Sequence, residues 1–278
     1  MLDAQRLTTA LARPSTDLGL LAEFANLRPD LQIHLYGQLP STNETAWQLI
    51  DQGQGAGTVV IAERQTAGRG QWGRTWMSPP GGLYLSLVLE PELLLSEGAL
   101  LTLTSAWGIA TSLNNLGMPL QIKWPNDLVS HRRKVGGILT ESRLANCVAM
   151  EDAAQLQQVV VGVGLNWDNP LSPNAISLRE LLPELAKPAF ETLEELAAIV
   201  LRGVLQGVHY WQQQGNAAFV NAYTQKLAHR GKTVKVNGHN ARVEGVSLEG
   251  DLIVSIGQGD GKFVRTLKSG EISLGYNY

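Results

Sequence analysis

Cysteine, long basic runs and long apolar runs are nearly absent from this sequence of 278 residues. A single cysteine, Cys147, excludes an internal disulfide bond and a zinc site built from several thiolates, and it is typical of a reducing compartment. No apolar stretch approaches the roughly 18 residues of a membrane-spanning helix, and the N-terminus lacks the pattern of a signal peptide. The composition therefore predicts a cytoplasmic protein without a membrane partner, in which Cys147 is a small buried hydrophobe.

Clustered positive charge is also missing. The formal net charge is -3, and lysine and arginine form no long run. A strong electrostatic footprint for nucleic acid is therefore excluded, and we expect no nucleic-acid partner. The five histidines are scattered without a metal-ligand spacing such as i, i+4, so the sequence by itself names no metal ligands.

The chain divides into three stretches. Residues 1–30 have little periodicity and read as a leader, too short for a winged-helix DNA-binding domain, which needs about 60 residues. Residues 31–228 alternate strand and helix patterns, and residues 229–278 carry short alternating strands separated by Gly and Asn turns, typical of a small antiparallel β-barrel. The predicted strands are 32–36, 58–62, 83–89, 135–141, 159–165, 233–236, 241–246, 252–256 and 263–267.

Three helices are predicted. Ser41 and Glu44 have the spacing of a capping box, and Thr192 and Glu195 repeat it before a long apolar stripe. Residues 100–116 have apolar side chains at helical spacing and end at a glycine. We therefore expect helices after Ser41, over 100–116, and from Thr192 until the pattern fades near residue 229.

Residues 63–76 form the most unusual segment, because three glycines and the two spaced arginines Arg69 and Arg74 follow a good strand. Glycines let backbone N–H groups approach a ligand closely, and the side chains of Arg69 and Arg74 offer forks for phosphate or carboxylate. The segment is not a Walker motif, since no G-K-[ST] follows. The alternative is a flexible surface loop.

Three shorter segments carry weaker signals. K-W-P-N-D at 123–127 halts a strand at a proline and is either a simple turn or a set of polar groups at a strand end. Lys134 leads into a strand with paired glycines, typical of a bulge or a close ligand approach, although an edge lysine in solvent is the alternative. The small residues of 162–166 fit a ligand site or close packing of a strand on a helix.

The order and spacing of these motifs resemble the biotin–protein ligase family. The resemblance rests on six motifs: S-T-N at 41–43, Q-x-A-G-R-G-x-x-G-R-x-W at 65–76, L-Y-L-S at 83–86, K-W-P-N-D at 123–127, R-K-x-x-G-I-L at 133–139 and G-x-G-x-N at 162–166. G-E-I-S-L at 270–274 resembles the SH3-like C-terminal domain of bacterial members. The resemblance covers residues 33–275 and implies an α+β fold like the class II aminoacyl-tRNA synthetase core: a mixed, largely antiparallel sheet backed by helices, plus the small barrel. The alternation of elements alone also allows a doubly wound sheet.

The resemblance implies that biotin and MgATP give biotinyl-5′-adenylate, from which biotin passes to a lysine of the biotin carboxyl carrier protein of acetyl-CoA carboxylase. It gives Lys134 and Arg69 the catalytic task of offsetting the repulsion between two anions. The residues matched to biotin are Ser41, Thr42, Asn43, Gln65, Gly68, Arg69, Gly70, Gln71, Lys134, Gly137 and Leu139. Those matched to the nucleotide are Arg69, Arg74, Trp76, Lys123, Asn126, Asp127 and Asn166. Asp127 or a phosphate oxygen could take the proton of the carrier lysine.

One position departs from the family pattern. Many relatives have arginine where this chain has Gln71, and we predict that Gln71 and Trp72 replace that charge by hydrogen bonding and stacking. Three rival functions stay open: a lipoate–protein ligase, a DNA-binding repressor that senses the adenylate, and a biotin-binding protein without activity. The short leader and negative charge favour a monofunctional ligase over the repressor, and Arg69 together with Lys134 favours an enzyme.

Overall fold

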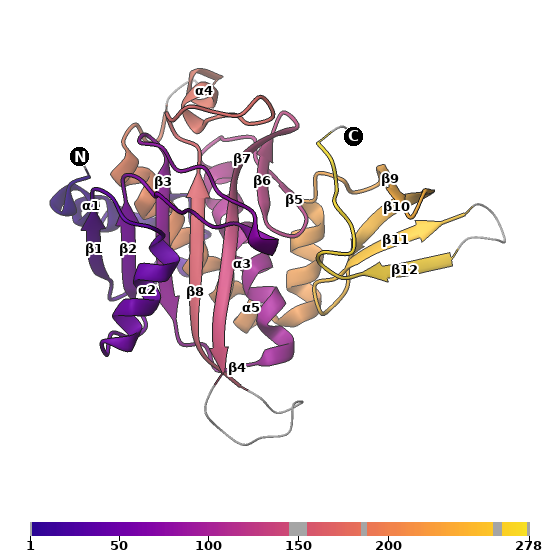
Figure 1. Cartoon of the computed structure of the whole chain (residues 1–278), viewed down its shortest axis with the longest axis horizontal. Helices are drawn as coiled ribbons and strands as arrows, with labels where there is room; N and C mark the ends of the chain where they lie inside the picture. The colour runs from indigo at the N-terminus through magenta and orange to yellow at the C-terminus, as the bar shows by residue number, and fades with distance from the viewer. Residues whose placement is uncertain (1, 145–154, 185–187, 258–262, 277–278) are drawn as a thin grey trace.

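The structure is a computed structural model that describes residues 2–144, 155–184, 188–257 and 263–276. Cys147 lies outside these residues, so its predicted burial stays a prediction. Two β-sheets and a layer of long helices make up the described chain (Figure 1).

The larger sheet is mixed and largely antiparallel. Its strand order is β1-β2-β3-β8-β7-β6-β5, with β4 paired to β8, and only β1 and β2 run parallel among the paired strands described. The α+β prediction is confirmed, and a doubly wound parallel sheet is excluded. The strands are β1 (Gln32–Tyr36), β2 (Thr58–Ala62), β3 (Leu83–Leu89), β4 (Leu93–Leu94), β5 (Gln121–Lys123), β6 (Asp127–Ser130), β7 (Arg133–Leu144) and β8 (Gln155–Leu165).

Both faces of this sheet are covered by helices. Along β2, Val59 and Ile61 join the main apolar core with α3 (Gly98–Asn115) and α5 (Leu193–Gln225), whereas Val60 and Ala62 pack with α2 (Thr42–Asp51) in a second cluster. Successive side chains of a strand point to opposite faces, so a continuous apolar strand is buried on both. Figure 1 shows α2 on one face of the sheet and α3 and α5 on the other.

Helices α3 and α5 approach each other closely. A Cβ at Gly108 would lie 2.0 Å from the backbone oxygen of Gly203, and one at Gly207 would lie 2.1 Å from that of Thr104. Since α3 is buried along nearly its whole length, these glycines let two backbones meet in the core. Among the described residues, no helix combines the length and apolarity that crossing a membrane requires.

The N-terminal residues are ordered parts of the fold, which the sequence analysis did not predict. Asp3 caps helix α1 (Ala4–Leu11) by accepting from the N–H of Arg6, and two short 3-10 helices follow, η1 (Ser15–Leu18) and η2 (Ala22–Phe24). Leu7 and Leu18 are fully buried in the main core. The pattern was missed because only a few apolar residues, spread over three short helices, face the core.

The two predicted capping boxes have different outcomes. Thr192 and Glu195 form one at the start of α5, as predicted. Ser41 stands at the N-cap of α2, but its side chain makes no cap hydrogen bond, so the predicted box with Glu44 is wrong. Instead, Gln65 Oε1 accepts from the N–H of Thr42 at 2.8 Å and satisfies the first turn from a distant loop.

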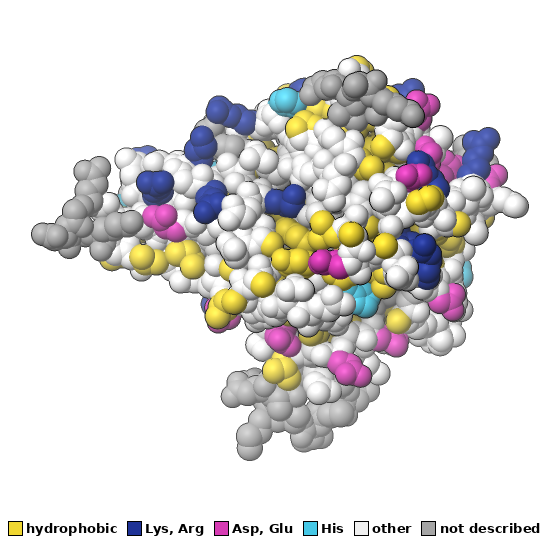
Figure 2. Space-filling model, turned by 180° about the vertical axis from the view of Figure 1, so that it is seen from behind, with side chains coloured by type: hydrophobic (Ala, Val, Ile, Leu, Met, Phe, Trp, Pro, Cys, Tyr) yellow, Lys and Arg dark blue, Asp and Glu magenta, His cyan; other side chains and the backbone are white. Residues whose placement is uncertain are grey.

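The smaller sheet has the antiparallel order β12-β11-β10-β9, and its strands match the predicted segments closely. They are β9 (Thr233–Val236), β10 (His239–Val246), β11 (Leu252–Ile256) and β12 (Phe263–Leu267). Trp124 Nε1 donates to the backbone oxygen of Gly250 at 2.9 Å and joins the two sheets. Seen from behind, apolar side chains gather across the middle of the molecule with charged ones around them (Figure 2). The remaining helical turns are η3 (Gln71–Gly73), η4 (Leu95–Glu97), α4 (Leu178–Leu181) and η6 (Leu182–Glu184).

Candidate active site

A cavity of about 570 Å³ lies where α2 begins, β7 and β8 pass, and the glycine-rich loop and the C-terminal residues approach them. Fifteen of the predicted site residues line it. They are Ser41, Thr42, Asn43, Gln65, Arg69, Gly70, Gln71, Arg74, Trp76, Lys123, Asn126, Asp127, Lys134, Gly137 and Leu139. Residues from four separate motifs therefore share one space.

Two predicted site residues do not line this cavity. Gly68 packs inside the loop, where a Cβ would meet the backbone oxygen of Trp76 at 2.4 Å. Asn166 is buried, and its Nδ2 donates to the backbone oxygen of Lys134 at 3.2 Å. Both therefore support neighbours that do line the cavity.

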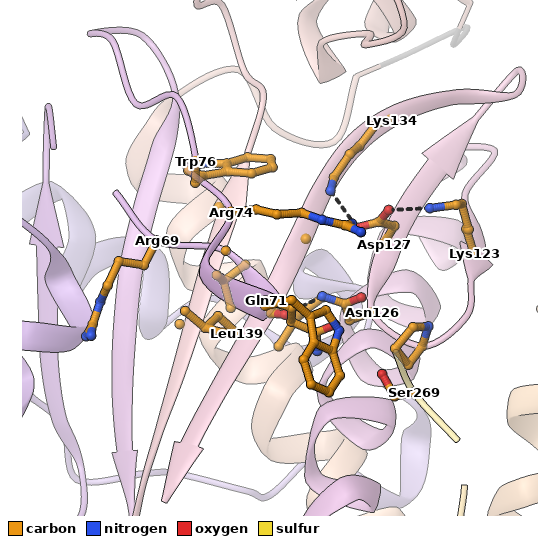
Figure 3. Close-up of a pocket in the computed structure, with 18 of the residues that line it drawn as sticks. Arg69, Gln71, Arg74, Trp76, Lys123, Asn126, Asp127, Lys134, Leu139 and Ser269 are labelled. Carbon is orange, nitrogen blue, oxygen red and sulfur yellow. Dashed lines mark hydrogen bonds and ion pairs between the residues drawn. The ribbon is translucent and has the colours of Figure 1, made fainter. Parts of the chain in front are cut away.

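An ion-pair network occupies one end of the cavity (Figure 3). Asp127 Oδ1 lies 2.5 Å from Lys134 Nζ, and Asp127 Oδ2 accepts from Lys123 Nζ at 2.9 Å. Burial by itself raises the pKa of the Asp127 carboxyl, but the charges and hydrogen bonds of the two lysines outweigh it and hold that pKa below its usual value. Two cations thus share one carboxylate, which leaves this end of the cavity with net positive charge.

The β6–β7 hairpin brings these charges together. The register shifts so that Leu128 pairs with Gly136 while Val129 pairs with Lys134, which leaves Val135 as the extra residue. Of the two features that the paired glycines predicted, a bulge or a close ligand approach, the bulge is confirmed, at the residue before Gly136. It directs Lys134 toward the cavity, where a Cβ at Gly137 would stand 3.5 Å from Lys134 Nζ.

Trp76 covers the same lysine. Its ring centroid lies 5.1 Å from Lys134 Nζ, close enough for a cation–π interaction. A Cβ at Gly164 would lie 2.5 Å from Trp76 Nε1, so only glycine on β8 leaves room for the indole. Trp76 Nε1 is buried and has no hydrogen-bond partner within the described parts of the chain. It is a donor that a polar ligand could satisfy.

Arg69 lines the cavity but does not contact Lys134, with which the sequence analysis gave it a shared catalytic task. Its Nη2 donates to Glu141 Oε2 at 3.1 Å, and Figure 3 shows the guanidinium directed away from Lys134 and Asp127. The same oxygen of Glu141 accepts from Asn43 Nδ2 at 3.0 Å and from Trp47 Nε1 at 3.2 Å. Glu141, which the sequence analysis missed, is therefore the acceptor that holds Arg69 in this structure.

Polar side chains at the start of α2 form the other end of the cavity. Asn43 is buried, and its Oδ1 accepts from Ser86 Oγ at 2.6 Å. A Cβ at Gly162 would lie 2.2 Å from the same oxygen. Gln65 is bound to Thr42 and donates to Ser78 Oγ at 2.7 Å. These side chains are preorganised by neighbours on three strands and a loop.

The C-terminal residues 269–274 also line the cavity, and the sequence analysis assigned them no role there. The only sequence signal in this stretch is the G-E-I-S-L motif, which indicates the C-terminal domain. Its local pattern does not predict contact with a cavity whose other residues lie more than a hundred positions earlier in the chain.

The described side chains of this cavity do not group into a set of magnesium ligands. No three His, Cys, Asp or Glu side chains are grouped as metal ligands among residues 2–144, 155–184, 188–257 and 263–276. The carboxylate of Asp127 is already bound by two lysines. These residues do not form a preformed magnesium site, and the ion would depend on the phosphates of the nucleotide and on water.

Comparison with known proteins agrees with this arrangement. Residues 35–166 match the model of the "Biotin/lipoate A/B protein ligase family". The chain is 30% identical to the bifunctional ligase/repressor BirA of Escherichia coli over 253 residues, which are 85% of this chain and 73% of that protein. It is 33% identical to BirA of Bacillus subtilis over 190 residues, and there it spans only 56% of the relative's length.

Solved structures of biotin ligases superpose on this chain. The biotin protein ligase of Aquifex aeolicus, in complex with biotin and ATP, superposes with a TM-score of 0.67 at 25% identity, covering 87% of this chain and 97% of that one. The Helicobacter pylori biotin acetyl coenzyme A carboxylase synthetase, at 19% identity and a TM-score of 0.54, shares the fold. The chain belongs to the biotin/lipoate A/B protein ligase family.

Proposed function

We propose that this protein activates biotin with ATP to form biotinyl-5′-adenylate. It then transfers the biotinyl group to a lysine of a biotin carboxyl carrier domain, which is the function that the sequence analysis predicts. The observation that carries the proposal is one cavity with buried polar groups at one end and a lysine pair at the other. The Aquifex aeolicus protein of the same fold was solved with biotin and ATP together. The proposed compartment is the cytoplasm, which fits the single cysteine.

In the first step, an oxygen of the biotin carboxylate attacks the α-phosphorus of ATP, the bond to the bridging oxygen breaks, and pyrophosphate leaves. Two anions must meet, so positive charge has to stand where they react. Lys134 supplies it, with Trp76 over its ammonium group and Asp127 fixing its position. Arg69 would join after leaving Glu141.

In the second step, the free amine of the carrier lysine attacks the acyl carbon, AMP leaves, and an amide forms. The amine loses a proton in this step. Because the pKa of Asp127 is lowered, its carboxylate is a weak base. We therefore assign Asp127 the positioning of Lys123 and Lys134, and leave the proton to a phosphate oxygen or water.

Biotin would lie at the end formed by Ser41, Thr42 and Asn43, where buried donors and acceptors suit a ureido ring. The nucleotide would lie toward Lys123 and Asn126, near the positive end. Gly137 and Leu139 stand between the two ends on β7.

The test is ATP-dependent labelling of a purified carrier domain, with biotin and lipoate run in parallel. We expect labelling with biotin alone, loss of labelling in Lys134→Ala, and full activity in Lys232→Ala, which removes an exposed lysine outside the cavity. Labelling with lipoate instead would overturn the substrate, and tight biotin binding without labelling would favour the inactive binding protein.

A further inference from the structure

The C-terminal segment, residues 269–276, leaves the small sheet after β12 and returns to the cavity. Figure 1 shows its yellow trace running from β12 past β5 toward the C-terminus. Its first six residues line the cavity, and Ser269 lies at the cavity's edge in Figure 3. The small sheet thus contributes to the site through this segment.

Two contacts anchor the segment before it reaches its end. Gly270 lies against Trp72 of the glycine-rich loop, where a Cβ would come within 2.9 Å of the indole. The backbone oxygen of Gly275 lies 3.0 Å from Nε2 of the buried His229. The position of Tyr276 is therefore tied both to the loop and to the turn that follows α5.

Tyr276 then reaches the ion-pair network. Its hydroxyl donates to Asp127 Oδ2 at 2.9 Å, and its ring centroid lies 4.5 Å from Lys123 Nζ. Asp127 is 7% exposed, so these contacts form with little competition from water. Oδ2 is thereby shared by Lys123 and Tyr276, while Oδ1 faces Lys134.

We infer that Tyr276 is a positioning residue for adenylate formation, acting through Asp127 on Lys134. This inference rests on the proposed function. The tyrosine contacts neither reacting group. It donates to Asp127 Oδ2, whereas Lys134 pairs with Asp127 Oδ1. By fixing the plane of the carboxylate and sharing its charge, it limits how strongly Asp127 competes with an anionic ligand for Lys134.

Tyr276→Phe removes only the hydroxyl. Hydrogen bonds to charged groups are stronger than neutral ones, and we expect kcat/KM for ATP to fall about tenfold. The dissociation constant for biotin should stay within about twofold of the wild-type value, because Ser41, Thr42 and Asn43 are untouched. The variant keeps the ring beside Lys123, so the fold should be retained.

The pH dependence of kcat/KM distinguishes a positioning role of Tyr276 from a purely structural one. The charged and titratable groups around Asp127 are Lys123, Lys134, Tyr223 and Tyr276. A hydrogen bond to a carboxylate favours its charged form, so losing the Tyr276 hydroxyl raises the pKa of Asp127. The acid limb of kcat/KM should therefore move to higher pH in Tyr276→Phe, which a packing defect alone would not cause.

The experiment is ATP–pyrophosphate exchange with biotin, measured against pH for wild type, Tyr276→Phe and Tyr210→Phe. Tyr210 stacks on Trp107 away from the cavity and serves as the matched control. The inference is supported by two results together. Only Tyr276→Phe lowers kcat/KM and shifts its acid limb, and adding Tyr276→Phe to Asp127→Asn lowers kcat/KM no further.

Other outcomes overturn it. Exchange by wild type and by Tyr276→Phe with identical profiles refutes the role of Tyr276 and leaves the proposed function standing. An effect of Tyr276→Phe that persists undiminished in the Asp127→Asn background shows that the tyrosine acts elsewhere. Absence of exchange in the wild type refutes the proposed function itself, and the role of Tyr276 with it.

Discussion

Replacing Glu141 by glutamine should strengthen nucleotide binding, because it releases Arg69. One oxygen of Glu141 accepts from Arg69, Asn43 and Trp47 in the present structure. Glutamine keeps an oxygen that can accept from the two neutral donors but removes the charge that attracts the arginine. Arg69 is thereby freed to turn toward the cavity, where a nucleotide would place its phosphates.

The size of the effect follows from exposure. The side chains of Arg69 and Glu141 are 44% and 27% exposed, so solvent screens the pair, and it is worth about 0.5–1 kcal/mol. Since 1.4 kcal/mol is a factor of ten, the ratio of free to paired Arg69 rises about two- to fivefold. The dissociation constant for a nucleotide should fall by up to the same factor.

Calorimetry with a non-hydrolysable ATP analogue measures this directly. Asp51→Asn is the matched control, because it breaks an ion pair with Arg143, whose side chain is also 44% exposed but lies outside the cavity. That control should leave the dissociation constant unchanged. Unchanged or weaker nucleotide binding by Glu141→Gln would show that Arg69 does not need to leave Glu141, and the reasoning would be wrong.

Three further predictions concern stability and the biotin end of the cavity. Burial lowers the pKa of His229 to about 4, below its usual 6.5, so the protein takes up a proton when it unfolds between these two pH values. The free energy of unfolding should therefore fall by up to about 3 kcal/mol as pH drops from 6.5 to 4. Denaturant melts should show a smaller fall in His229→Gln. Gly162→Ala would push a methyl group into Asn43, and titration should show biotin affinity about tenfold weaker with nucleotide affinity retained. Gly108→Ala forces the backbone of Gly203 aside and should cost about 2 kcal/mol or more in chemical unfolding. A flat pH profile, unchanged biotin affinity and wild-type stability are the respective refutations.

Much of the fold could be predicted from local pattern. The strands β1, β2 and β3 begin and end where their apolar runs do, and the capping box at Thr192 marks the start of α5. These signals are local, because side-chain alternation and helix caps depend on neighbours within a few residues. The parallel pairing of β1 with β2 was beyond such patterns and was not predicted; only the mixed, largely antiparallel character of the sheet came from the family resemblance.

The site divides in the same way. Fifteen of the residues that the family resemblance assigned to the site, including Lys134 and Asp127, line one cavity. Their motifs are short and local, so they could be matched in the sequence. The partners of those residues were not visible. Glu141 is 72 residues from Arg69, and Tyr276 is 149 residues from Asp127.

The sequence by itself therefore determined most of the strands and the helices α2, α3 and α5. Through family resemblance it also gave the mixed class of the fold and the residue types of the cavity walls. Only the tertiary structure decided which donor meets which acceptor. It replaced the expected cap by Ser41 with one from Gln65, and turned Arg69 to Glu141. The physical reason is that a buried polar group must be satisfied, and its nearest partner in space can come from any part of the chain.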